Sequence, residues 1–227
     1  MTGITVYPTS AALRRAQARI AEIKGFCDSR GKISVRMFMG ECAEAACLAG
    51  LLKAADGTVL RPAQDLERDL AIVEACRRFS CPDHRNTLSG SLSRIGLEET
   101  LVRLSAYVDP LAAAANQFLD ALENDENPRN SDLAELYRAY DAALIEIGCA
   151  SGARVNAAIL DLLQSGREKW PPFLRDARKV VFTGLRWVPP FIELSAGKLG
   201  EKLGPENVRL IHILEEHEQE WWGDRLM

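Results

Sequence analysis

The chain has 227 residues, of which 47% are hydrophobic and 26% charged, with 16 glycines and 10 prolines. This composition is typical of a globular chain that buries one or two cores, and it excludes a disordered, collagen-like or low-complexity protein. The net charge of -4 argues against a dedicated nucleic-acid binder, whose domains usually carry a basic balance.

No apolar run in the sequence approaches the roughly 18 to 20 residues that a membrane-spanning helix needs. The opening residues, MTGITVYPTS, lack the basic and then apolar pattern of a signal peptide. We therefore expect no membrane partner and a cytoplasmic location.

The first predicted unit is a strand followed by a helix. Residues 4–7 form a β-branched and aromatic run, Ile-Thr-Val-Tyr, that ends at Pro8. The hydroxyl of Thr9 or Ser10 is suited to cap the helix that apolar residues at helical spacing predict over residues 11–23.

The same pattern repeats further along. A short strand is predicted over residues 32–35 and a helix over about 38–53. A further helix is predicted over 65–79 from its apolar residues Leu66, Leu70, Ile72, Val73 and Cys76. Successive strand–helix units favour a parallel sheet with crossover helices.

The middle of the chain changes character. Residues 82–91 are typical of a loop, and residues 92–164 hold helical periods without a convincing strand. Strand signals then return over 179–183, which lead into Gly184, and over 208–214, with a helix over 190–203 between them.

This order predicts an α/β fold with a small, mainly parallel sheet flanked by helices and a large all-helical insert. We expect an α/β domain formed by residues 1–80 and 175–227, and a helical lobe over 85–170.

The charges are distributed unevenly. Residues 1–40 contain seven basic and two acidic residues, whereas residues 206–227 are acidic. The basic residues that a helix over 11–23 would display are Arg14, Arg15 and Arg19, and Arg36 follows the second strand. Such a surface can contact phosphates, and the alternative is an ordinary solvated face.

Six cysteines in a chain without an export signal favour buried thiols over a disulfide framework. The five-residue spacings of Cys42 with Cys47 and of Cys76 with Cys81, together with His84, make zinc the metal to weigh. Side chains five apart on a helix diverge, which argues against zinc. We expect neither a metal nor a cofactor.

The motifs of common nucleotide and hydrolase sites are missing. The phosphate-binding motif G-x-x-x-x-G-K-[ST] does not follow the first strand, and the pair Gly197-Lys198 precedes Leu199 instead of Ser or Thr. The motifs G-x-G-x-x-G and G-x-S-x-G are also missing, and no acidic pair has the lysine that a nuclease needs. We therefore expect no catalytic residue.

Several segments resemble AddB-type helicase-nuclease subunits of bacterial double-strand-break repair, which are related to the RecB and RecC subunits. They are ITVYPTSAALRR (4–15), KISVRMF (32–38), LERDLAIVEA (66–75), LYRAY (136–140) and KVVFTGLRWVPPFIE (179–193). In that family a strand ending in Pro-Thr leads into an arginine-bearing helix. The phosphate-binding loop of active members and their nuclease domain have no counterpart here, so the resemblance implies a degenerate helicase-like domain.

The resemblance and the residues together predict a non-catalytic module of DNA repair or recombination, which acts as a scaffold or as a weak, sequence-independent DNA contact through Arg14, Arg15, Arg19 and Arg36. Its partners would be DNA and a helicase-nuclease partner subunit. One alternative binds or converts a nucleotide or small phosphate, with Thr9, Ser10 and Gly184 as the anion site. Another is a protein-interaction module that docks through Trp221 and Trp222.

Overall fold

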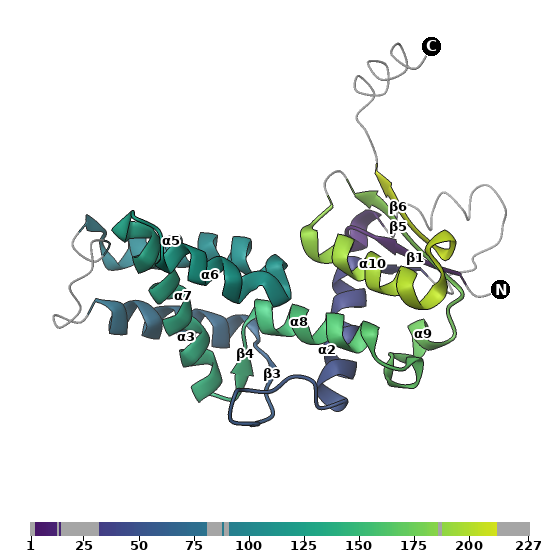
Figure 1. Cartoon of the computed structure of the whole chain (residues 1–227), viewed down its shortest axis with the longest axis horizontal. Helices are drawn as coiled ribbons and strands as arrows, with labels where there is room; N and C mark the ends of the chain where they lie inside the picture. The colour runs from purple at the N-terminus through teal and green to yellow at the C-terminus, as the bar shows by residue number, and fades with distance from the viewer. Residues whose placement is uncertain are drawn as a thin grey trace, which may run out of the picture. The chain divides into compact units, whose positions relative to one another are not determined.

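The computed structural model describes residues 3–12, 14, 32–80, 88, 91–185 and 188–212. The chain forms two compact units (Figure 1). The first combines residues 1–45 with 163–227, and the second comprises residues 46–162.

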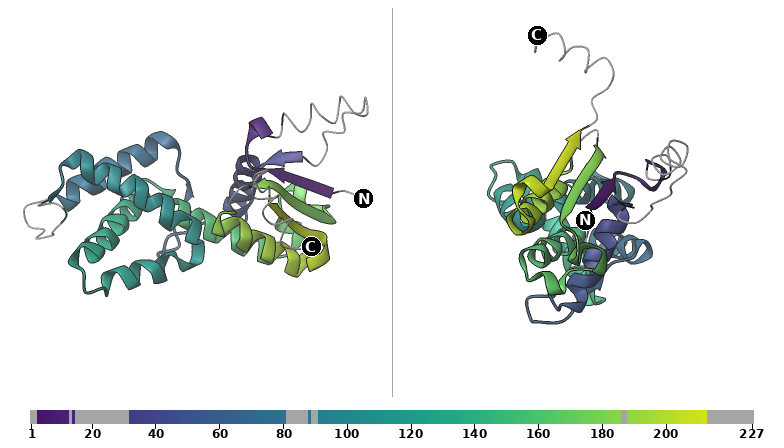
Figure 2. Two further views of the ribbon diagram at one scale, coloured as in Figure 1. Left: turned by 90° about the horizontal axis from the view of Figure 1, so that it is seen from above. Right: turned by 90° about the vertical axis from the view of Figure 1, so that its right-hand side faces the viewer.

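The first unit contains a four-stranded sheet built from both ends of the chain. Its strands are β1 (Gly3–Tyr7), β2 (Lys32–Ser34), β5 (Lys179–Leu185) and β6 (Val208–His212). The order is β2-β1-β5-β6, and every neighbouring pair is parallel (Figure 2). The predicted α/β fold is therefore confirmed.

The two central strands of this sheet, β1 and β5, have one buried face. Ile4 and Val6 of β1 pair with Val180 and Phe182 of β5, and all four side chains are buried. Helix α2 (Val35–Leu48) covers them with Phe38, whose ring lies edge-on to Phe182 at a centroid distance of 5.5 Å. Alternation along each strand thus places the apolar residues in the core.

Proline and glycine set the two ends of the helix that connects β5 to β6. Helix α10 (Pro190–Leu203) begins at a proline in its first turn and ends at Gly204, whose φ is +91°. The short 3-10 helix η3 (Pro205–Asn207) then leads into β6. The helix predicted over 190–203 is confirmed.

The second unit is a helical bundle with a two-stranded ladder. Its elements are α3 (Asp65–Phe79), α5 (Arg94–Val108), η1 (Asp109–Ala114), α6 (Ala115–Glu123), α7 (Pro128–Glu146), α8 (Gly152–Gln164), β3 (Arg61–Pro62) and β4 (Cys149–Ala150). The pairing of β3 with β4 corrects the expectation that residues 92–164 hold no strand. Two short helices follow α8: the 3-10 helix η2 (Arg167–Lys169) and the α-helix α9 (Pro172–Arg175).

The units divide the chain at other positions than the sequence predicts. Helix α3 packs against α7 and α5, so residues 65–79 belong to the helical unit and not to the α/β domain. Residues 163–170, which we expect in the helical lobe, belong to the first unit instead.

Two helices also differ in detail from the prediction. The helix expected over 38–53 starts at Val35 and ends at Leu48. It ends there because Gly50 adopts a φ of +66° and the Leu51 amide donates back to the Ala46 carbonyl. Helix α3 has its predicted bounds, yet Leu66 and Leu70 are exposed.

The buried face of α3 consists of Ala71, Ala75, Cys76 and Phe79. The predicted helix over 11–23 is described only at residues 10–12 and 14, which are helical. None of the described helices is long and apolar enough to cross a membrane.

Candidate functional site

The residues predicted for an anion or DNA site follow the carboxyl ends of the parallel strands. Thr9 and Ser10 come directly after β1, Arg36 lies two residues after β2, and Gly184 is the penultimate residue of β5. Since these three strands are neighbours and parallel, their carboxyl ends meet at one edge of the sheet. This is the edge at which open parallel sheets usually bind ligands.

At the first two helix starts on this edge, side-chain hydroxyls accept hydrogen bonds from backbone amides. The Ala12 amide donates to Thr9 Oγ1 at 3.0 Å, and the Met37 amide donates to Ser34 Oγ at 3.2 Å. These bonds are N-terminal caps, and each one occupies an amide that a phosphate would otherwise accept from.

The third helix start offers few donors. Gly184 lies inside β5 and not in front of a helix, because the strand continues to Leu185 with a register irregularity. Helix α10 begins with Pro189 and Pro190, which have no amide hydrogen. Among the described residues, this carboxyl edge therefore offers no cluster of free amides such as a phosphate cradle needs.

Two of the predicted DNA-contacting arginines are described, and both are exposed: Arg14 on the helix after β1, and Arg36 in the first turn of α2. Arg15 and Arg19 lie outside the described residues, as do Trp221 and Trp222.

A polar network that the sequence does not predict lies inside the helical unit. Tyr137 is buried and donates its hydroxyl hydrogen to Asp109 Oδ1 at 2.7 Å. Ser151, also buried, donates to Asp141 Oδ1 at 2.6 Å, and Arg154 binds both oxygens of Asp141 from Nε and Nη2. The network joins η1, α7 and the start of α8.

Asp109 is the buried carboxyl of this network. Burial raises the pKa of its carboxyl, while the hydrogen bonds from Tyr137 and the Ala153 amide act in the opposite direction. Burial and the neighbouring Asp109 charge raise the pKa of Tyr137. The Asn156 side chain fixes the same segment by donating to the Asp109 carbonyl at 2.8 Å.

The backbone around Asp109 is unusually constrained. Ala112 has a φ of +49°, and it is the one described non-glycine residue with a positive φ. Such a conformation costs about 1–3 kcal/mol and persists where the surroundings enforce it. At Gly152, an added Cβ would lie 2.2 Å from Asp109 Oδ2, so only glycine fits beside that carboxylate.

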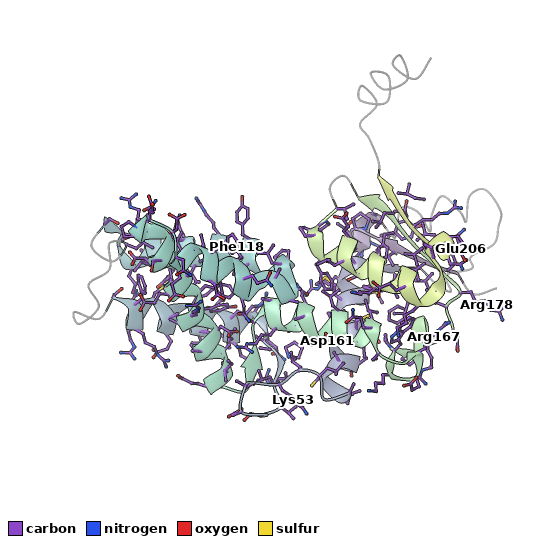
Figure 3. The ribbon with its side chains drawn as sticks, in the orientation of Figure 1. Lys53, Phe118, Asp161, Arg167, Arg178 and Glu206 are labelled. Carbon is purple, nitrogen blue, oxygen red and sulfur yellow. The ribbon has the colours of Figure 1, made fainter. Side chains whose placement is uncertain are left out.

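A hollow of about 220 Å³ adjoins the network in the same unit. Its lining includes Lys53 and Asp161, which are labelled in Figure 3. Asn116, Asp141 and Arg154 also line it. It is smaller than the roughly 300–1,000 Å³ of typical small-molecule pockets.

The hydrogen bonds of this network hold the fold together. The Arg154 guanidinium is engaged by Asp141, and the Tyr137 hydroxyl is engaged by Asp109. A nucleophile with an adjacent free base does not occur among these side chains. The network locks η1 onto α7 and α8, and sequence reasoning misses it because its members lie far apart in the chain.

The described cysteines are free thiols, and Cys42, Cys76 and Cys149 are buried, as predicted. Burial raises the pKa of the Cys42 thiol, so this thiol stays protonated at neutral pH. In the described part of the chain, no group of three His, Cys, Asp or Glu side chains is placed to hold a metal ion. Cys81 and His84 lie outside that part.

No protein-family model, curated protein or solved structure matches this chain.

Proposed function

We propose that this chain is a non-catalytic, helicase-like module of DNA repair or recombination that contacts DNA weakly and without sequence preference. What supports the proposal is where the family-like segments lie. Residues 4–7, 32–34 and 179–185 are three adjacent strands of one parallel sheet, although well over a hundred residues separate the second from the third.

The contact surface is the basic segment after β1 together with the start of α2. Arg14 and Arg36 are exposed and follow neighbouring strands, and Arg15 and Arg19 belong to the same basic segment of the sequence. Arginines in this setting bind phosphates and not base edges, so the affinity depends on salt and is blind to sequence.

Two observations favour this function over a nucleotide-binding enzyme. Hydroxyl caps occupy helix starts at the carboxyl edge, and α10 starts with two prolines. Neither arrangement provides the amide cradle on which nucleotide sites depend.

The test is binding of the full chain to fluorescent single- and double-stranded DNA at low and moderate salt, with a labelled ATP analogue in the same series. The variant replaces Arg14, Arg15 and Arg19 with Ala, and its control replaces the exposed Arg103, Arg129 and Arg209 with Ala. We expect salt-sensitive DNA binding that only the first variant weakens, by roughly tenfold or more.

Equal DNA affinity in the two triple variants and the unaltered chain would remove the basic helix as the contact. Saturable binding of the ATP analogue would favour the nucleotide-binding alternative.

A further inference from the structure

A second basic surface lies at the opposite, amino-terminal edge of the same sheet. A hollow of about 540 Å³ opens there beside Gly3, the first residue of β1, and Lys179, the first residue of β5. Four cationic side chains line it: Arg167, Arg178, Lys179 and Lys202. They come from η2, from the start of β5 and from the end of α10, so no single stretch of sequence reveals them.

One of these cations is held in a fixed position. Arg167 Nη2 donates to the Arg175 carbonyl at 2.7 Å and to the Ala177 carbonyl at 2.5 Å. Its guanidinium carbon lies 5.4 Å from the ring centre of the buried Trp170. These contacts orient the guanidinium, and within the described residues they use only Nη2 of its nitrogens, so that Nε and Nη1 are the donors a ligand would meet.

The other three cations are exposed and lack carboxylate partners among the described residues. Arg178, Lys179 and Lys202 form no ion pair within that part of the chain. Glu168, Glu201 and Glu206 each adjoin a lining residue in the sequence, and Asp176 lies two residues before Arg178, but none of these carboxylates lines the hollow. Glu201 pairs with Lys198 at 3.2 Å, and Glu206, which Figure 3 labels, accepts a hydrogen bond from Asn207 Nδ2 at 2.9 Å. The lining that the structure describes therefore carries four cations and no carboxylate.

We propose that this hollow is a second nucleic-acid contact, which binds the phosphodiester groups of a strand. The inference rests on the proposed function, because it assumes that DNA is the polyanion that the chain meets. Four cations from three parts of the fold provide several weak contacts, as a backbone with one charge per phosphate requires.

The composition of the lining favours the backbone of a strand over a compact nucleotide. Helix α10 contributes its carboxyl-terminal end through Lys202 and Leu203, and the negative end of the helix dipole opposes a concentrated phosphate dianion. The described lining also contains no aromatic side chain on which a base would stack.

The test compares charge reversals in the full chain. The variant combines Arg178→Glu with Lys202→Glu, and the control combines Arg103→Glu with Arg129→Glu, which are exposed residues of the helical unit. Both variants change the net charge equally. Binding to a fluorescent single strand is measured over a salt series, with inorganic pyrophosphate as a second ligand and circular dichroism as the check on folding.

We expect the hollow variant to lose roughly tenfold in affinity and about one unit of salt slope for each cation removed, while the control binds nearly as the unaltered chain does. Equal losses in both variants, or no loss in either, would overturn the assignment of the hollow and leave the proposed function standing.

If the unaltered chain fails to bind DNA at low salt, both proposals fall. Saturable pyrophosphate binding that the hollow variant abolishes, without DNA binding, would assign the hollow to a small phosphate instead.

Discussion

Asp109 and Gly152 depend on each other, and this makes Gly152→Ala the most informative single change in the helical unit. The new Cβ would lie 2.2 Å from Asp109 Oδ2 and 2.9 Å from its Cβ, so the carboxylate would have to leave Tyr137. We expect a loss of about 1–3 kcal/mol in the free energy of unfolding, measured by urea denaturation.

The matched control for this change is Gly197→Ala in α10. No heavy atom lies within 4 Å of a Cβ added there, so alanine should stabilise the helix by roughly 0.5–1 kcal/mol. A Gly152→Ala variant as stable as the unaltered chain would show that Asp109 moves without cost.

Glu67 couples the stability of the helical unit to pH. Arg61 Nη1 donates to Glu67 Oε2 at 2.7 Å, the Gln64 amide donates to the same oxygen at 2.9 Å, and together with Cys149 they lower the Glu67 pKa to about 2. A lowered pKa contributes stability above the unfolded value near 4.5, and this contribution is lost as the pH falls toward 2.

Glu67→Gln should therefore lower the urea midpoint at pH 7, and the difference from the unaltered chain should shrink as the pH falls from 5 to about 2. Glu74 and Glu146, whose pKa values are also lowered, remain in both proteins, so this difference isolates Glu67. A difference that stays constant with pH would contradict the ion pair as the cause.

Among the elements, α2 stabilises the first unit chiefly through Phe38. Its ring is fully buried between Phe173 and Phe182 at centroid distances of 6.0 and 5.5 Å. We expect Phe38→Ala to cost about 3–5 kcal/mol in thermal or urea unfolding, and Phe38→Leu to cost clearly less because it preserves most of the volume. Similar costs for the two variants would mean that the aromatic contacts themselves dominate.

Helix α3 provides a test of which face is buried. Leu70 is 58% exposed and Phe79 is 2% exposed. Leu70→Gln should change the free energy of unfolding by less than about 0.5 kcal/mol, whereas Phe79→Ala should cost roughly 3–5 kcal/mol. A large loss from Leu70→Gln would place that leucine in a contact outside the described residues.

The helices with clear end signals were predictable from the sequence. Pro190 and Gly204 bracket α10, and the capping box of Gln64 with Glu67 marks the start of α3. The buried face of α3 was not predictable, because the leucines that dominate its pattern point to solvent and small residues such as Ala71 and Ala75 fill the core. Strand β4 has two residues, Cys149 and Ala150, without the β-branched pattern that signals a strand.

The edge that collects Thr9, Ser10, Arg36 and Gly184 was predictable, since parallel strands share their carboxyl ends. The polar network was not, because no local pattern links Asp109 to Tyr137. The left-handed φ at Ala112 was also unpredictable, since alanine gives no signal where glycine would.

At the scale of the whole molecule, the net charge of -4 conceals basic groups at both edges of one sheet. Surface cations separated from acidic groups attract a polyanion locally, even on a chain that is acidic overall. Salt dependence is therefore a better test of the proposed function than affinity at one salt concentration.

The sheet of the first unit has a consequence for the order in which the chain can fold. Val6 of β1 pairs with Phe182 of β5, and the entire helical unit lies between them in the sequence. A ribosome thus releases β1 and β2 long before their partner exists, and a two-stranded ribbon is marginally stable on its own. The helical unit, whose contacts are complete by residue 162, can fold while the amino-terminal strands wait. The sheet of the first unit cannot form until β5 has been synthesised. Until then β1 and β2 remain exposed, and this is the stage of biogenesis at which the chain is most open to aggregation.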